Sequence, residues 1–407
     1  MSGPLRRPAF ARLWLGGMLS ETGDWLLHIS LPLFVLGLTG SPLITAVTFM
    51  LGLLPSVVCA PIGGVLADRW DRRRMIVWVS VAQAALLLPL LAVDGPDRLW
   101  LVLVVTGAQA ALAAVFEPAK NALVPVLVEP DQLAGANGLI GFASSMGRLL
   151  GGPLGGVVLQ VWGIHGVVLA DALSFLVVAA LMAPRRGMPV SGAGERPPFG
   201  KWWRQWTDGL RVVLAPGPLR PVAIIAGLLG LAQGMFVALF VFYVTDVLGA
   251  GEAETGLLRG VQAIGGLAGG LIAGWLARRM GDKVLAGGSL LVFALIGVLG
   301  WNGPYLTTAL WVYIGLFAAI GAPAVTGISA LLALLQRSAD PRQLGKAMGG
   351  FQAISDGAQG IGMLASGALV GVLPISVLLN AQISLYALAG FLLLAGTSMR
   401  HPTPVPA

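Results

Sequence analysis

Apolar and polar segments alternate along this chain in a pattern typical of a protein that crosses a membrane many times. A hydrocarbon layer of about 30 Å is crossed by roughly 20 residues of helix. We predict that the first six membrane-spanning helices lie at 11–38, 44–66, 75–93, 99–120, 136–160 and 165–184. The second six are predicted at 220–247, 254–277, 284–301, 306–335, 347–372 and 376–398. The fold expected from this pattern is an all-α, polytopic membrane protein.

The longest polar segment, 185–219, separates the two sets of six helices. We therefore expect a bundle at 1–184, a cytoplasmic linker at 185–219 and a second bundle at 220–407. Within the linker, helical spacing places three tryptophans of 201–214 near one face. Such an amphipathic helix is predicted to lie in the membrane surface. A regulatory or partner-binding helix is the alternative.

Two pairs of segments show that the halves repeat each other. The sequence GVLADRWDRR at 64–73 matches GWLARRMGDK at 274–283, and PDQLAGANG at 130–138 matches PRQLGKAMG at 341–349. The offsets are 210 and 211 residues, so the two bundles are predicted to be related by duplication. Repeats of this kind build transporters that bind substrate between two lobes, near the middle of the membrane.

The distribution of basic residues predicts the orientation of the chain. With the N-terminus inside, 22 of the 25 lysines and arginines fall in cytoplasmic segments, as the positive-inside rule requires. We expect a plasma (inner) membrane protein with both termini in the cytoplasm. The net charge of +7 then reflects topology, and no nucleic-acid partner is expected.

Composition narrows the function classes further. Charged residues make up 11% of the chain, about half the share of a soluble domain. Cys59 is the single cysteine, no cluster has metal-ligand spacing, and no phosphate-binding loop of the G-x4-G-K-[ST] type occurs. We expect no cofactor, no metal and no enzymatic activity, and we expect a monomer in the lipid bilayer.

The loop after the second predicted helix carries a motif. It runs from Gly64 through Val-Leu-Ala to Asp68 and Arg69, and continues as Trp-Asp to Arg72 and Arg73. This resembles the diagnostic motif of the major facilitator superfamily, and the resemblance covers essentially the whole chain. It implies the twelve-helix major facilitator fold and a conformational latch in which Asp68 pairs with arginine across the lobe interface. Arginines that only set topology are the alternative for Arg73.

Other segments resemble one branch of that superfamily. The stretches GDWLLHISLPLFVLGLTGSP, FEPAKNALVPVLVEPDQLAGANG and ADALSFLV are similar to bacterial exporters related to macrolide-efflux and enterobactin-export proteins. The fifth helix also approximates an antiporter motif, with Gly152, Pro153 and Gly156 in place. Gly147 is one residue out of register, and Arg148 stands where a glycine belongs. The resemblance implies export.

Acidic residues inside the first predicted helix are candidates for proton coupling or for contact with a cationic substrate. Charges in a bilayer interior are costly and therefore often functional. Asp24 lies about 18 Å deep at 1.5 Å per residue, and Glu21 is three residues earlier on nearly the same face. Neighbouring carboxylates raise each other's proton affinity. For Asp24 and Glu21 the alternative is a structural role at a backbone irregularity, and for His28 we expect packing.

Two further pairs of charges are predicted in the first half. Arg148 and Asp171 lie at similar depth in consecutive helices, so a buried ion pair is expected, either structural or facing the cavity. Glu117 and Lys120 lie three residues apart near the cytoplasmic end of the fourth helix. We expect them to form a gate or an interfacial pair.

The second half offers fewer candidates. Arg259, just inside the outer end of the eighth helix, is a candidate gate residue. Gln233, Gln352 and Asp356 are candidates for the cavity wall or for proton coupling, with polar helix packing as the alternative for the glutamines. For most of the aromatic residues between 236 and 243 we expect packing against lipid rather than contact with substrate.

The sequence therefore predicts a secondary transporter, with proton-coupled export of a small hydrophobic or amphipathic compound such as an antibiotic or siderophore. Uptake or lipid translocation by the same fold is the first alternative. A non-transporting membrane receptor is the second. The sequence leaves the cargo, the stoichiometry and the coupling ion open.

Overall fold

The computed structural model describes residues 4–129, 132–183, 209–277, 279–339 and 343–395. Within these ranges the chain is helical and contains no strand. The first bundle contains α1 (Pro8–Thr39), α2 (Pro42–Arg69), α3 (Arg72–Leu87), α4 (Leu99–Leu127) and α5 (Leu133–Met182). The second contains α7 (Leu219–Phe242), α8 (Glu252–Ala277), α9 (Asp282–Asn302), α10 (Leu310–Ser338), α11 (Leu344–Leu369) and α12 (Ile375–Ala395). Short 3₁₀ turns lie at Pro4–Arg6, Leu88–Ala92, Pro96–Arg98 and Gly303–Tyr305, and a π-helical turn at Tyr243–Val247.

Helix α5 contains two of the predicted spans. Its backbone leaves helical geometry at Gly163, where φ is 63° and ψ is −166°. A side chain at this left-handed position would be strained, so glycine is the residue that allows the chain to reverse here. Counting α5 as two helices, the described residues contain the twelve predicted spans, each starting within a few residues of its predicted position.

Eight of the described helical segments are long and apolar enough to cross a membrane. Helices α2, α8 and α11 are not among them, and of α2 only the shorter stretch Pro42–Leu53 is apolar throughout its described residues. All three lie between the bundles, where α8 packs against α5 and α11 packs against α2, so less of their surface needs to face lipid. The predicted fold class, an all-α polytopic membrane protein, is confirmed.

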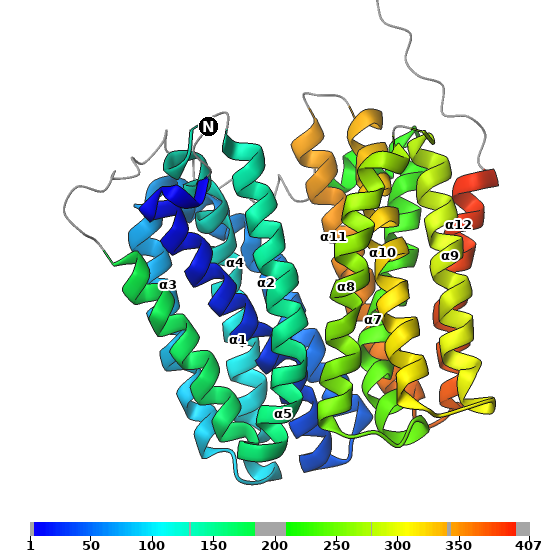
Figure 1. Ribbon diagram of the computed structural model, residues 1–407, viewed down its shortest axis with the longest axis horizontal. Helices are drawn as coiled ribbons and strands as arrows, with labels where there is room; N and C mark the ends of the chain where they lie inside the picture. Colours follow the sequence, from blue (N-terminus) through cyan, green and yellow to red (C-terminus); the bar gives the residue numbers. More distant parts are fainter. Residues whose placement is uncertain (1–3, 130–131, 184–208, 278, 340–342, 396–407) are drawn as a thin grey trace, which may run out of the picture.

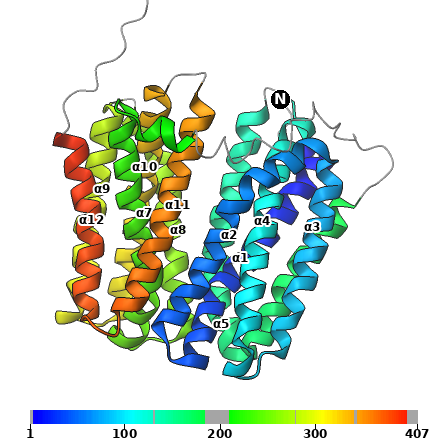
Figure 2. The ribbon, with the colours of Figure 1, turned by 180° about the vertical axis from the view of Figure 1, so that it is seen from behind.

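The two bundles stand side by side and carry equivalent helices (Figures 1 and 2). Helix α3 begins at Arg72 and α9 at Asp282, which is the predicted offset of 210 residues. Helix α5 begins at Leu133 and α11 at Leu344, the offset of 211 residues. We call the face at which α1 begins and α12 ends the terminal face, and the other end of the bundles the opposite face.

The bundles touch through close helix contacts near the opposite face. A Cβ atom on Gly152 of α5 would lie 2.9 Å from the carbonyl oxygen of Gly256 in α8, and one on Gly156 would collide with the backbone at Glu252. The second contact joins α11 to α2, where a Cβ atom on Gly367 would lie 3.3 Å from the carbonyl oxygen of Pro42. Small residues permit this approach. Toward the terminal face the bundles diverge (Figure 1).

Apolar packing follows the same division. One cluster of buried side chains fills the second bundle, and another, near the terminal face, lies within the first. A third centres on first-bundle residues but includes Val237, Val241 and Met363 of the second bundle, so apolar packing continues between the bundles.

The expectation that the aromatic residues of α7 face lipid was wrong for most of them. Phe240, Phe242 and Tyr243 are buried in the second bundle, and Tyr243 donates a hydrogen bond to the Gly300 carbonyl oxygen at 2.6 Å. Phe236 lines the cavity between the bundles. The burial of these aromatic residues could not be predicted, because α7 is apolar on every face and its sequence does not indicate which face meets lipid.

The predicted surface helix of the linker is described only at its end, and residues 201–208 lie outside the described ranges. Residues 209–214 are helical. Val213 is fully buried in the core of the second bundle, and a Cβ atom on Gly209 would lie 2.8 Å from the Lys346 carbonyl oxygen. This end of the linker therefore packs on α11.

Candidate functional site

A cavity of about 990 Å³ lies between the bundles. In α5 its lining runs from Gly141 to Arg148, before the Gly152 contact, and in α8 it runs from Arg259 to Gly270. It therefore lies on the terminal-face side of the contact between α5 and α8. Most of its lining comes from the second bundle and is apolar or aromatic, with Ser145, Gln233, Gln262, Ser329 and Gln382 as its uncharged polar side chains.

Two arginines, one from each bundle, are the charged side chains among the described lining residues. The guanidinium carbon of Arg148 lies 5.3 Å from the ring centre of Trp25. That of Arg259 lies 4.6 Å from Phe236 and 5.6 Å from Phe240. These distances suit cation–π contacts. Arg259, predicted to be a gate residue at the outer end of its helix, is 7% exposed and forms part of the cavity wall.

A second, smaller cavity of about 230 Å³ lies within the first bundle. Asp24 and His28 of α1 and Asp171 of α5 line it, together with residues of α2, α3 and α4. The absence of a side chain at Gly23 brings α1 against α5 here, because a Cβ atom would collide with Asp171 Oδ1 and the Ser174 hydroxyl. Asp24 and Asp171 repel each other electrostatically.

The environments of these three residues differ. Asp171 is fully buried and accepts a hydrogen bond from the Ser174 hydroxyl at 3.3 Å, while its Oδ2 atom has no hydrogen-bond partner in the described part of the chain. The His28 ring packs edge-on against Trp25 and Phe49, with centroids 5.3 and 5.8 Å away. His28 thus has the packing contacts that we expected, at the wall of the acid-lined cavity.

The predicted ion pair between Arg148 and Asp171 is not formed. Arg148 points into the cavity between the bundles, and Asp171 points into the cavity within the first bundle. Equal depth along two helices does not place two residues on facing sides of those helices. The rotation of α5 about its axis is set by Gly147 and Gly151, which pack against the α1 backbone.

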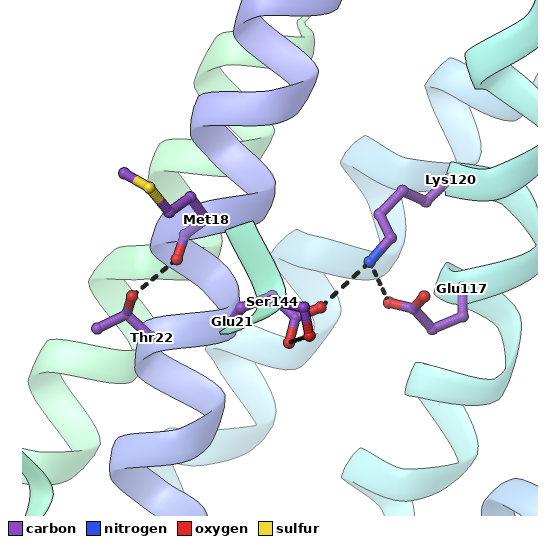
Figure 3. A network of polar contacts seen from close by, with 6 residues as sticks. All are labelled: Met18, Glu21, Thr22, Glu117, Lys120 and Ser144. Carbon is purple, nitrogen blue, oxygen red and sulfur yellow. Dashed lines mark hydrogen bonds and ion pairs between the residues drawn. The ribbon is translucent and has the colours of Figure 1, made fainter. Parts of the chain in front are cut away.

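Three charged side chains meet between α1 and α4 (Figure 3). The Lys120 Nζ atom lies 2.6 Å from Glu117 Oε1 and 3.4 Å from Glu21 Oε1. The Ser144 hydroxyl of α5 donates to Glu21 Oε2 at 3.4 Å. The expected pair of Glu117 and Lys120 is present, and Glu21 joins it rather than the cavity that holds Asp24.

The polar candidates of the second half separate. Gln233 lines the cavity between the bundles and accepts a hydrogen bond from the Tyr386 hydroxyl at 3.2 Å. Gln352 donates to Asp356 at 2.8 Å, and neither lines the two cavities described above. Asp356 therefore lies apart from both cavities.

The loop that suggested a latch is described in part. The side chains of Gly64, Asp68 and Arg69 lie outside the described ones. The Arg73 guanidinium donates to the backbone oxygens of Met182 and Ala183, at 2.7 and 2.6 Å. Arg72 is the first residue of α3. Arg73 thus satisfies carbonyl groups at the end of α5 within its own bundle, in addition to any role at the lobe interface.

The glycines of the antiporter-like motif lie on two faces of α5. Gly147, with Gly151 and Gly155, packs against α1, whereas Gly152 and Gly156 pack against α8. Pro153 lies beside Gly260 of α8. The sequence motif therefore marks the contact between the bundles.

The sequence analysis did not name Gln83 and Gln109, which line the smaller cavity within the first bundle. Gln109 donates to the Gln83 backbone oxygen at 2.8 Å, and both side-chain oxygens are buried without partners in the described part of the chain. Glutamine inside an apolar span is a signal that could have found them. It also missed Gln382, which accepts a hydrogen bond from Trp301 at 3.1 Å on the wall of the larger cavity.

Comparison with known proteins identifies the family. Residues 1–405 match the family described as "Transmembrane secretion effector", a branch of the major facilitator superfamily. The chain belongs to this family. It is a major facilitator transporter and not an enzyme.

Similar curated proteins include exporters. The transporter is 23% identical to macrolide efflux protein A of Streptococcus pyogenes over 363 residues, 88% of each chain. It is 26% identical to the enterobactin exporter EntS of Citrobacter koseri, covering 98% of this chain and 95% of that protein.

Solved structures show the same fold. The transporter matches a variant of the nucleoside transporter NupG with a TM-score of 0.77 at 14% identity, covering 95% of this chain and 99% of that one. A bacterial homologue of ferroportin matches at 18% identity, with 95% and 98% of the two chains covered. Its inward-facing structure gives a TM-score of 0.70 and its outward-facing structure 0.61.

Proposed function

We propose that the transporter exports small hydrophobic or amphipathic compounds from the cell in exchange for protons. The observation that carries this proposal is the cavity of about 990 Å³ between the bundles, with its largely apolar and aromatic wall. Such a wall suits a hydrophobic ligand, and its position suits alternating access between two lobes. The similarity to a macrolide efflux protein and to an enterobactin exporter supports export.

The membrane orientation follows from the basic residues. Arg7, Arg73 and Arg337 lie at helix ends on the terminal face, which the positive-inside rule assigns to the cytoplasm. The cavity then opens inward, since the contact between α5 and α8 closes its other end. The higher TM-score to the inward-facing ferroportin homologue supports this state.

Proton coupling is assigned to Asp24 and its neighbour Asp171. Two carboxyl groups that line one small cavity repel one another, and a shared proton relieves the repulsion. Asp24 has no hydrogen-bond partner in the described part of the chain and lines the small cavity, so it is the group available to load and release a proton. Glu21 is held by Lys120 and Ser144 and assists from the next turn.

The test uses purified protein in proteoliposomes with an imposed pH gradient. The substrate is a compound against which the chain protects a pump-deficient host. Asp24→Asn should lower gradient-driven transport about a hundredfold or more, the scale of lost proton transfer, while the protein remains folded. The matched control is Asp97→Asn, which removes an exposed carboxylate between α3 and α4. Unchanged transport by Asp24→Asn would refute the coupling role.

A further inference from the structure

Arg148 and Arg259 are placed in the wall of an apolar cavity at a free-energy cost. A charge held away from water inside a membrane costs about 3 kcal/mol or more. Each arginine also keeps one buried guanidinium nitrogen without a hydrogen-bond partner in the described part of the chain, Nε of Arg148 and Nη1 of Arg259. Buried donors of this kind normally have a hydrogen-bond acceptor, which a ligand could supply here.

The two side chains come from opposite bundles and are close neighbours. A Cβ atom on Gly260 would lie 3.0 Å from the Leu149 carbonyl oxygen, so the helices touch at the residues that follow the two arginines. Their positive charges repel each other. Glu21 attracts Arg148 electrostatically, but it is not within ion-pair distance, and its oxygens are engaged by Lys120 and Ser144.

Both guanidinium groups lie beside aromatic rings in the cavity wall. Trp25 lies beside Arg148, and Phe236 and Phe240 lie beside Arg259. The paired N–H groups of a guanidinium match the paired oxygens of a carboxylate or a phosphate. No aspartate or glutamate stands among the described residues of the cavity wall to occupy them.

We propose that the substrate is an amphipathic anion, with an apolar or aromatic body in the cavity and an oxyanion group between Arg148 and Arg259. This rests on the proposed transport function, because it assigns the chemical class of the substrate to the same cavity. The oxyanion attracts both guanidinium groups, lowers the net positive charge between them, and joins the bundles beside the contact between α5 and α8. Binding therefore favours the conformation in which these two helices touch.

The experiment measures binding without any gradient, in the full chain reconstituted in nanodiscs. The probes share one aromatic body and differ in charge: 1-pyrenebutyrate, its neutral methyl ester and the cation 1-pyrenebutylamine. Energy transfer from Trp25 and Trp301, which line the cavity, to pyrene reports occupancy. We expect the wild-type protein to bind the carboxylate about tenfold more tightly than the ester, a difference of about 1.4 kcal/mol, and to bind the amine weakest.

Variants of the two arginines test whether these residues cause the preference for the carboxylate. Arg148→Gln and Arg259→Gln should each lower carboxylate affinity several-fold, and the double variant should bind carboxylate and ester equally. Arg148→Lys and Arg259→Lys should keep part of the preference, because charge remains while the planar fork is lost. The matched control, Arg98→Gln, removes an exposed arginine that bonds the Ala92 carbonyl oxygen outside the cavity, and it should behave as wild type. Thermal unfolding of every variant checks folding.

Three results would overturn the inference: equal binding of carboxylate and ester by the wild type, preference for the amine, or a preference that survives in a folded double variant. Failure of the proposed function looks different. If the carboxylate binds selectively but no pH gradient drives its movement, the anion site stands and proton-coupled export does not. If probes of every charge are exported alike, export stands and the anion site does not.

Discussion

The two cavities of this transporter differ in size, in sign of charge and in the helices that line them. The cavity of about 230 Å³ is formed by helices of the first bundle alone and contains Asp24 and Asp171. The cavity of about 990 Å³ lies between the bundles and contains Arg148 and Arg259. Acids and arginines are thus kept in separate compartments. A proton and a substrate that bind in separate compartments must influence each other through the helices between them.

Helices α1 and α5 both line the two cavities, and α1 does so with adjacent residues. Asp24 and Trp25 are consecutive residues. Asp24 lines the smaller cavity, whereas Trp25 lines the larger cavity and lies beside the Arg148 guanidinium. A change in the protonation of Asp24 that rotated or shifted this turn would move the side chain against which Arg148 packs. We therefore hypothesise that protonation of Asp24 is coupled to the position of Arg148 through this turn of α1.

After Asp24→Asn, the largest effect is expected from Asp171→Asn, which removes the second acid of the cavity within the first bundle. Without its repulsion, Asp24 should release its proton at a different point of the cycle, and gradient-driven transport should fall about a hundredfold. Pyrenebutyrate binding in the absence of a gradient should stay unchanged. Proteoliposome flux and nanodisc binding, measured on the same preparation, give the two values.

The double variant Asp24→Asn with Asp171→Asn sharpens the comparison. If the two carboxyls act as one unit, its transport should be no lower than that of either single variant, since effects within one unit are not additive. Additive losses, or weaker probe binding in Asp171→Asn, would show that the cavities are not separate compartments.

A smaller effect is expected at the contact that closes the arginine cavity. Gly156→Leu inserts a side chain where a Cβ atom alone would collide with the α8 backbone. Overpacking costs about 1–3 kcal/mol, so the state in which α5 and α8 touch should become about tenfold less populated. Double electron–electron resonance between labels on α5 and α8 near the opposite face should show a longer distance. Gly37→Leu, at a position with open space, is the control.

The smallest effect is expected from Lys120→Gln, which leaves Glu21 and Glu117 without their shared cation. Lys120 is buried, with 7% of its side chain exposed, so stability should fall by about 1–2 kcal/mol. Glu117→Gln should cost less, because 49% of the Glu117 side chain is exposed and exposed ion pairs contribute about 0–1 kcal/mol. Thermal unfolding in one detergent measures both, and the reverse order would contradict the assigned burial.

The helices could be predicted from the sequence because the length of an apolar run and the membrane thickness fix each span with little freedom. The repeat also predicted where α9 and α11 begin, since Arg72 and Leu133 have equivalents at the same offsets. The side on which a residue faces was harder to predict. The pairing of Arg148 with Asp171 failed because depth is readable from residue number, whereas rotation about the helix axis depends on glycine contacts with α1.

Individual residues of the candidate site could be predicted from the sequence, but their arrangement in space could not. Asp24, Arg148, Arg259 and Gln233 were all named for their charge or polarity inside a span, and each lines a cavity. Their division into two cavities depends on the packing of helices from both bundles, which no single segment specifies. The aromatic wall was missed for the same reason, since Phe236 and Trp301 look like any other apolar residue in their own helices.

The glycine contact between the bundles occurs twice. Gly156 meets α8 at Glu252 and Ala253, and its repeat equivalent Gly367 meets α2 at Pro42 and Leu43, the equivalents of those two residues. Each half thus carries both surfaces of one contact, as two halves related by duplication would. Arg148 and Arg259, in contrast, correspond to Gln359 and Phe49. Only one of the two equivalent joints therefore has arginines beside it, so the proposed anion site has no counterpart at the joint between α11 and α2.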